Sequence, residues 1–425
     1  MEKPEKLTGE YFVEDMTAAE RDIARRVEQV LPALEQAAAR ADETGEFPVG
    51  HIRTFQEAGL PGLVVPREYG GLGGGLRDLC AATFALATVC PSTAMTYFFH
   101  CSGASRGLLP LEAIDAGLFT KEEEPQVRFF AERLLRRMGD EGLWMANFAS
   151  ETGKSSEAAI TILTEAKKEK GGWRLNGVKS FGCATGVAHQ YIVTARMEGA
   201  ADTNGLAVFI VDAASPGVRV RGDWNTIGMR ATASNGIILE DVFVPDEDAL
   251  AIDGAFTRMM TVSRGSFVGN QVAGIAVYLG AAWSLYRHII RHLQTQKFRD
   301  TGAPIGEAPF QLQLVGEMTR DLQTAMLWMQ RQLQLEASDP PPLPKEEVVR
   351  QWRLCKGEAA EAAFRVAGNA FKAGGTSGTD NNGVIVRLMR DLSMGLVQAF
   401  PAERGRLEAA RMVIAGAGQP QFGLG

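Results

Sequence analysis

The residues that could do chemistry in this chain match none of the common hydrolytic or metal-binding signatures. The histidines are dispersed, and only His288 and His292 stand one helical turn apart, without the glutamate of an HExxH motif. The five cysteines show no CxxC spacing, so neither a zinc site nor a disulfide framework is indicated. The glycines from Gly70 to Gly75 are not followed by GKS or GKT, which argues against a phosphate-binding loop. A Rossmann fingerprint is also missing, so any dinucleotide must be held by another architecture.

The composition indicates a folded protein with more than one domain. The chain has 425 residues, of which 45% are hydrophobic and 22% are charged, and this length exceeds one ordinary compact core. The formal net charge of −7 argues against binding to nucleic acid. The N-terminus lacks the pattern of an export signal, and no run of about 18 apolar residues occurs. We therefore expect a cytoplasmic protein that does not cross a membrane.

The first part of the chain, residues 1–142, is predicted to be a helical domain. Thr17 and Glu20 have the spacing of a capping box, which starts a helix over 17–42. Pro32 is expected to kink or interrupt this helix. Further helices are predicted over 76–114, with breaks at Pro91 and Pro110, and over 119–137.

Residues 143–252 favour short strands bounded by turn-forming residues. The predicted strands cover residues 173–181, 190–195, 206–211, 218–221 and 237–244. Because no helix separates them, they predict an antiparallel sandwich or barrel. After residue 252 the helical period returns, and one stripe of Val272, Ile275, Leu279 and Ile289 is expected to be buried. Helices over 310–337, 345–372 and from 384 complete a C-terminal four-helix bundle over 253–425. The whole is an α+β multidomain fold.

This order of domains, together with several local motifs, resembles the acyl-CoA dehydrogenase superfamily over nearly the whole chain. The segment from Asn147 to Glu157 resembles the TEPxxGSD stretch of the family. By this resemblance, Ala149 and Ser150 face the pyrimidine edge of FAD, and Ser156 lies on the pyrophosphate or substrate side. The proline and the aspartate of the motif are replaced by Thr152 and Glu157.

Two further segments of the β-domain carry the resemblance. The segment from Asn176 to Cys183 is similar to the NGxKxWIT hairpin of the family. The resemblance implies that Phe181 shields the isoalloxazine ring and that Cys183 bonds flavin N5, although a thiol is a weaker donor than the usual hydroxyl. The stretch from Gly228 to Pro245 resembles the segment that ends the family's β-domain.

The C-terminal part matches the family at four places. Arg264 resembles the arginine that opens the first long helix and borders the catalytic centre. Arg299 resembles the arginine that reaches the FAD pyrophosphate of a neighbouring subunit. Lys297 is the alternative match for this arginine. The turn at Gly374 and Gly375 looks like the family's GGxG turn, in which small residues let the backbone approach a phosphate. The adjacent Arg390 and Asp391 match the family's RD pair, which we interpret as a structural ion pair.

The catalytic glutamate of the family has no counterpart here. Its usual position, eight residues beyond Asp391, is Ala399, and the alternative position before Arg264 is Ser263. Neither residue can remove an acidic α-proton from a thioester unaided. Glu403, one helical turn beyond Ala399, is a weak candidate for a displaced base.

Three hypotheses about function stay open. The first is α,β-dehydrogenation of an acyl-CoA or another acyl thioester in fatty acid metabolism, with FAD and a base in another position. The second is a flavin-dependent monooxygenase of the same fold, and the third is a non-catalytic flavoprotein subunit. The first is slightly preferred because the stretch from Trp224 to Arg230 looks more like the dehydrogenase branch. The resemblance also implies a homotetramer, with an electron-transfer flavoprotein or a flavin reductase as electron partner.

Overall fold

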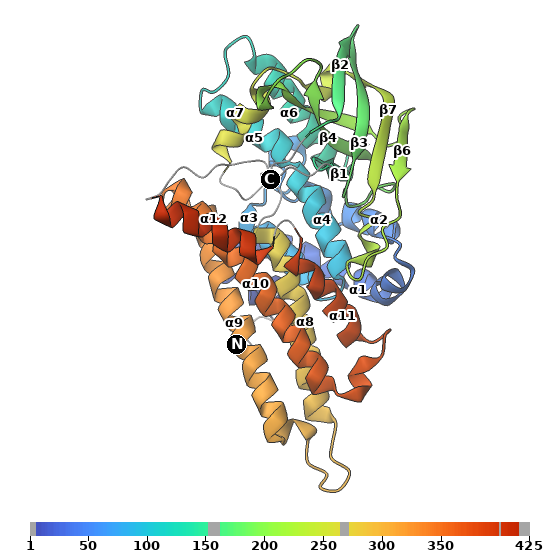
Figure 1. Cartoon of the computed structure of the whole chain (residues 1–425), viewed down its shortest axis with the longest axis vertical. Helices are drawn as coiled ribbons and strands as arrows, with labels where there is room; N and C mark the ends of the chain where they lie inside the picture. The colour runs from blue at the N-terminus through green and yellow to red at the C-terminus, as the bar shows by residue number, and fades with distance from the viewer. Residues whose placement is uncertain (1–5, 152–161, 264–271, 399–400, 416–425) are drawn as a thin grey trace.

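A computed structural model describes residues 6–151, 162–263, 272–398 and 401–415 of the chain. It contains a helical N-terminal domain, a curled central sheet and a C-terminal helical bundle (Figure 1). The predicted fold is therefore confirmed. The expected boundaries at residues 142 and 252 fall in the connections that flank the sheet, and this division of the chain stays a prediction.

The helices of the N-terminal domain begin and end mostly where the sequence predicts. They are α1 (Ala18–Thr44), α2 (Gly50–Glu57), α3 (Leu76–Ala87), α4 (Pro91–Gly103), α5 (Ser105–Asp115) and α6 (Glu124–Gly139). The capping box of α1 is formed, since Thr17 Oγ1 accepts from the Glu20 N–H at 3.2 Å and the Glu20 carboxylate accepts from the Thr17 N–H at 2.7 Å.

Two of the expected helix breaks were wrong. Helix α1 continues through Pro32, whose ring is exposed while Val30 and Leu34 on either side are buried. Helix α5 likewise continues through Pro110, and the chain breaks instead at Ala104. In both places the packing of the flanking apolar residues outweighs the one backbone hydrogen bond that a proline removes.

The central domain is one sheet with strand order β6-β7-β3-β2-β4-β5-β8, in which β1 also pairs with β4. The strands are β1 (Met145–Phe148), β2 (Glu165–Glu169), β3 (Gly172–Lys179), β4 (Gln190–Met197), β5 (Leu206–Asp212), β6 (Val218–Arg221), β7 (Gly236–Pro245) and β8 (Ala249–Leu250). Most pairs are antiparallel, but β1 and β2 both run parallel to β4. The sheet is therefore mixed, because the connections that precede β4 are long enough for parallel pairing.

The C-terminal part consists of α7 (Ala255–Val262), α8 (Val272–Thr295), α9 (Pro309–Ala337), α10 (Lys345–Gly374), α11 (Val384–Ser393) and α12 (Ala402–Ile414). Helices α8 to α11 form the predicted four-helix bundle, and α12 crosses its upper end (Figure 1). The bundle packs directly on the N-terminal domain, where the buried Thr83 hydroxyl of α3 donates to the Ala273 carbonyl of α8 at 2.8 Å. None of the helices in the described ranges has the length and apolarity needed to cross a membrane.

Candidate active site

Two loops interlock at the end of the central sheet. The first, residues 181–185, follows β3, and the second, residues 228–235, precedes β7. Three backbone hydrogen bonds join them: Gly182 N–H to Asn235 O at 3.0 Å, Ala184 N–H to Thr232 O at 2.9 Å, and Thr185 N–H to Ala233 O at 3.0 Å. The sequence placed both loops in motifs of the resemblance, and the structure brings the two motifs together.

The backbone of both loops is strained. Phe181 and Ala184 have φ angles of 61°, and Met229 and Ala233 have φ angles of 51° and 46°. A non-glycine residue in this region costs on the order of 1–3 kcal/mol and persists only where its surroundings hold it. Such strain is typical of functional sites, which makes this junction the candidate active site.

Phe181 and Cys183, two of the residues predicted to touch the flavin ring, differ in exposure. The Phe181 side chain is 64% exposed, and its ring lies edge-on to Trp224 at 6.3 Å between centroids. A large exposed aromatic on a strained loop is available to stack on a planar ligand. Gly182 is required behind it, since a Cβ atom there would collide with the Phe148 ring. Cys183 is buried, and burial raises the pKa of its thiol to about 12, so the thiol stays neutral.

A chain of hydrogen bonds connects Cys183 to the bundle. Its Sγ lies 2.9 Å from Ser234 Oγ, which lies 2.8 Å from Thr232 Oγ1. The Thr232 hydroxyl donates to the Met229 carbonyl at 2.9 Å, and the Met229 N–H donates to Asp391 Oδ1 at 2.6 Å. Asp391 of α11 therefore holds the loop that positions Cys183.

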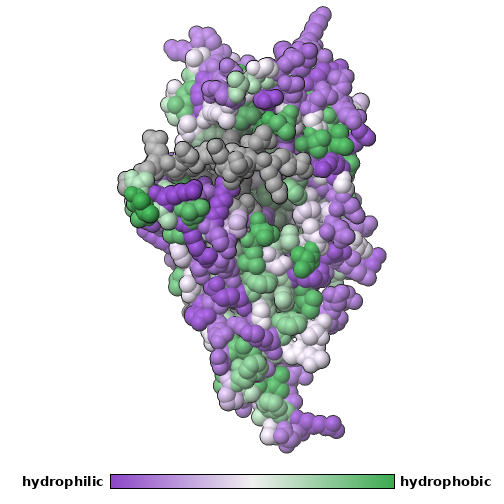
Figure 2. Space-filling model, viewed as in Figure 1, coloured by the Kyte–Doolittle hydropathy of each residue, from purple (hydrophilic) through white to green (hydrophobic). Residues whose placement is uncertain are grey.

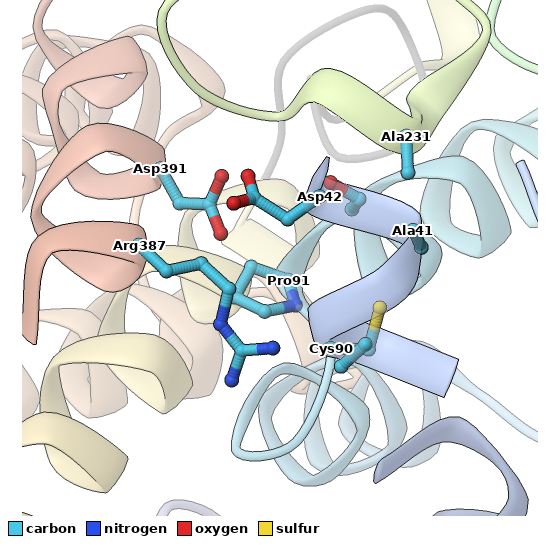
Figure 3. A pocket seen from close by; sticks show the side chains of 9 residues that line it. Ala41, Asp42, Cys90, Pro91, Ala231, Arg387 and Asp391 are labelled. Carbon is cyan, nitrogen blue, oxygen red and sulfur yellow. The ribbon is translucent and has the colours of Figure 1, made fainter. Parts of the chain in front are cut away.

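Asp391 lies beside a second carboxylate. The two carboxylates of Asp391 and Asp42 point toward each other across a small pocket where α1, α4 and α11 meet, with Arg387 below them (Figure 3). Burial, together with the charge of Asp42, raises the pKa of Asp391 to about 7, against the opposing bond from Met229.

The predicted ion pair between Arg390 and Asp391 is wrong. Arg390 binds Asp42 instead, with Nη1 3.1 Å from its Oδ1. Arg390 and Asp391 are neighbours on α11, so their side chains leave the helix in different directions. Asp42 also accepts from Arg230 through its backbone carbonyl at 2.7 Å. This junction thus joins all three domains.

A buried ion pair supports the segment that contains Ala149 and Ser150. Lys179 Nζ lies 2.8 Å from Glu151 Oε1 and donates to the Ala149 carbonyl at 3.3 Å. The side chains of Lys179 and Glu151 are 0% and 4% exposed. Burial by itself would raise the pKa of Glu151, but Lys179 and the bonds from Thr164 outweigh it and lower that pKa. The Ser180 N–H donates to the Ser150 carbonyl at 3.0 Å, so Ala149 and Ser150 lie next to Phe181.

The residues predicted to contact the phosphates of FAD lie elsewhere. Arg299 is exposed in the turn between α8 and α9, and Gly374 and Gly375 end α10. The Gln311 side chain donates to the Ala373 carbonyl at 3.3 Å and keeps these two regions together. They lie at the end of the bundle away from the sheet (Figure 1). One chain alone does not bring them to Phe181 and Cys183.

Three predicted residues, Ser156, Arg264 and Ala399, fall outside the described residues. Close to them in sequence, Ser263 is buried at the end of α7, and Glu403 is exposed in the first turn of α12. The exposed position of Glu403 gives it no enclosed site in which to act as a base.

The sequence prediction missed Tyr278 on α8. Its hydroxyl donates to the Gln398 side-chain carbonyl, and Gln398 Nε2 lies 3.2 Å from the sulfur of Met95. Burial raises the pKa of Tyr278 well above its usual value, and negative charge at Asp391 adds to this shift. The phenol thus lies close to the chain of hydrogen bonds that ends at Cys183. The available signal was its place in the sequence, three residues after Ile275 of the predicted buried stripe of α8.

A helical domain, a curled sheet with an interlocked loop pair and a four-helix bundle define the three-domain fold of the acyl-CoA dehydrogenases. Models of that family's N-terminal, middle and C-terminal domains match residues 17–110, 146–242 and 273–400. The amino sugar nitrososynthase DnmZ of Streptomyces peucetius is 30% identical over 307 residues, which are 72% of this chain and 70% of that protein. The chain therefore belongs to the acyl-CoA dehydrogenase superfamily.

A dehydrogenase and a further solved structure are also similar to this chain. The cyclohex-1-ene-1-carbonyl-CoA dehydrogenase of Geobacter metallireducens is 26% identical over 397 residues, which are 93% of this chain and 96% of that enzyme. The solved structure of KijD3 in complex with FMN and a dTDP-linked amino sugar has a TM-score of 0.78 at 23% identity, and 98% of each chain is covered. The similarity to the KijD3 structure shows that the two chains share a fold.

Proposed function

We propose that this chain is a flavin-dependent oxidoreductase of the monooxygenase type. The observation that carries the proposal is the absence of a carboxylate at both positions of the family's catalytic base, Ala399 and Ser263, together with the exposed position of Glu403. The likeness to DnmZ supports it, because making a nitroso group from an amine is an oxidation at nitrogen. A monooxygenase needs no base for a thioester α-proton.

The residues of the loop pair fit a flavin. Phe181 offers an exposed ring for stacking, Cys183 lies behind it in a buried polar chain, and the backbone of Ala149 and Ser150 borders the same edge. When bound and reduced, a flavin supplies two electrons with which one oxygen atom of O2 enters the substrate and the other leaves as water. The protein contributes orientation and exclusion of water, for which a rigid loop pair is suited.

The decisive experiment compares two ways of changing the flavin's redox state. Under anaerobic conditions, butyryl-CoA and octanoyl-CoA are expected to leave the absorbance of the oxidised flavin unchanged. Reduced flavin consumes oxygen without any protein, so flavin reduced by a supplied flavin reductase is expected to reoxidise at a different rate when the protein is present. Anaerobic bleaching by either acyl-CoA would reverse the assignment in favour of a dehydrogenase.

Dehydrogenation of an acyl thioester is the second candidate. It is favoured by the likeness to the Geobacter enzyme over nearly the whole chain. In that case an acyl-CoA would be the substrate and an electron-transfer flavoprotein the electron acceptor. Release of the cofactor by denaturation followed by chromatography distinguishes FAD, which we predicted, from FMN.

The substitution Ala399→Glu is expected to create acyl-CoA-dependent flavin reduction. A carboxylate at this position would meet the thioester α-proton if the resemblance holds, and general base catalysis contributes about 10²-fold or more. Anaerobic absorbance spectroscopy with octanoyl-CoA measures the rate, and Ala399→Gln is the matched control. An equal rate in the parent would reveal another base, for which Glu403→Gln is the next variant.

We further propose a homo-oligomer, with the tetramer as the expected form. Arg299, Gly374 and Gly375 lie far from Phe181 within one chain, so they would complete a flavin site only in a second copy. Phe310, Leu312 and Leu327 of α9 are exposed apolar side chains, and apolar side chains gather on the face of the bundle in Figure 2. Light scattering measures the mass, and a monomer that retains FAD would contradict this proposal.

A further inference from the structure

Arg106, in the first turn of α5, is a buried cation. It is 4% exposed, and its guanidinium lies over the Phe256 ring of α7, with Cζ 5.3 Å from the centroid. Its Nη1 contacts the sulfur of Met260 at 3.9 Å. Burial lowers the pKa of Arg106 to about 10, so the group keeps its charge at neutral pH.

Arg106 differs from the arginines around it in the described part of the chain. Arg258 of α7 binds both oxygens of Glu123 at 2.8 and 2.9 Å, and the buried Arg137 of α6 binds Asp248 at 2.8 Å. Within the described ranges no carboxylate pairs with Arg106, and its buried Nε–H has no acceptor. The hydroxyl of the adjacent Ser105, which is 1% exposed, has no partner there either.

An unpaired buried charge is costly. The free-energy cost of burying an ion without a partner exceeds what a buried cation–π contact returns. Thioether sulfur is a weak acceptor and adds little. A guanidinium has a planar fork of donors that matches a carboxylate or phosphate group in two parallel hydrogen bonds. The Arg106 guanidinium therefore has the surroundings expected of an anion-binding group.

The position of Arg106 connects it to the candidate active site. Met260 stands three residues before Ser263 on α7, a rise of about 4.5 Å along the helix axis. Ser263 is the position that the resemblance places beside the catalytic centre. An anion between α5 and α7 would thus lie next to the substrate side of the site, with Phe256 and Met260 against its apolar part.

We propose that Arg106 binds an oxyanion of the substrate, a carboxylate or a phosphate. The anion-binding site follows from the geometry of α5 and α7, and only its assignment to the substrate rests on the proposed function. The substrate class is therefore an anionic molecule with an apolar portion next to its charged group.

The experiment uses the full chain and three probes of similar shape: benzoate, phenyl phosphate and the neutral benzyl alcohol. Binding is measured by calorimetry and by the rise in melting temperature at constant ionic strength. At least one oxyanion is expected to bind, and Arg106→Met is expected to weaken it at least 10-fold, with Arg106→Lys in between. Benzyl alcohol is expected to show no dependence on Arg106. The preference between benzoate and phenyl phosphate identifies the chemical source of the oxyanion.

Two controls keep the proposal open to refutation. Arg258→Met, which removes a paired arginine from α7, the helix that also carries Phe256 and Met260, is expected to leave probe affinity unchanged. Without probes, Arg106→Met is expected to melt no lower than the parent, because it removes an uncompensated charge; a lower melting temperature together with unchanged probe affinity would show a structural role and overturn the proposal. Absence of oxyanion binding in the parent would also overturn it.

The third control concerns Glu157, a carboxylate outside the described residues. If Glu157→Gln makes the oxyanions bind more tightly, an internal carboxylate occupies Arg106, and the proposal fails. Failure to bind any flavin would instead overturn the proposed function. It would leave the Arg106-dependent affinity for oxyanions as a separate result.

Discussion

Replacing Lys179 by methionine is expected to lower the free energy of unfolding by about 3–5 kcal/mol, the cost of leaving one partner of a buried ion pair alone. The Glu151 carboxylate would remain buried, with only the bonds from Leu163 and Thr164 to stabilise it. The Ala149 carbonyl would also lose a donor. Urea denaturation followed by circular dichroism measures the change.

The matched control is the double variant Lys179→Met with Glu151→Gln, which removes both charges. It is expected to recover a large part of the lost stability, because the neutral amide can still accept from Thr164. The folded pKa of Glu151 is lowered, so its contribution to stability is present above the ordinary pKa of a glutamate and is lost as the pH falls through the folded value. A single variant as stable as the parent near neutral pH would show that Lys179 is not the counter-ion.

The sequence predicted most of the fold because its strongest signals are local. The capping box at Thr17, the break at Pro91 and the buried stripe of α8 all appear where the pattern places them. The pattern was wrong at Pro32 and Pro110, since a proline rule describes one backbone bond and cannot weigh the packing around it. The parallel pairs of β4 were also missed, because the pairing of distant strands leaves no mark in either strand alone.

The candidate site was predictable only in part. The motifs that contain Phe181 and Cys183 were identified, and the structure joins them to the second loop. The partner of Lys179 was not identified. Alternation along β3 places Lys179 on the same face as the buried Leu175, and a buried lysine requires a counter-ion. The contact of Asp391 with Met229 spans 162 residues, and no local pattern could have revealed it.

The substitution Asp391→Asn is expected to remove a pH dependence from the stability of the protein. The folded state holds the Asp391 proton up to about pH 7, whereas an unfolded aspartate releases it near pH 4. Between these values the folded state binds more protons, so the contribution of Asp391 to stability falls as the pH rises. A difference of one bound proton changes the free energy of unfolding by roughly 1.4 kcal/mol per pH unit. The contribution of Asp391 therefore falls by a few kcal/mol between these two pH values and does not change further at higher pH. Besides burial and the Met229 hydrogen bond, the charges that act on Asp391 are those of Asp42, Arg387 and Arg390.

Urea midpoints from about pH 5 to about pH 8, compared between the parent and Asp391→Asn, isolate this contribution from that of the other carboxylates. The asparagine oxygen can still accept from the Met229 N–H, so the flavin affinity of this variant is expected to stay close to that of the parent. Asp391→Ala removes the acceptor as well and leaves the buried Met229 N–H without a partner, at a cost of about 1–3 kcal/mol. The strained loop that contains Met229 can then move, and Ser234 and Cys183 would shift with it. Flavin fluorescence is expected to show that the flavin binds more weakly. If both variants bound flavin equally well, the hydrogen-bond chain from Asp391 to Cys183 would have no role in positioning the flavin site.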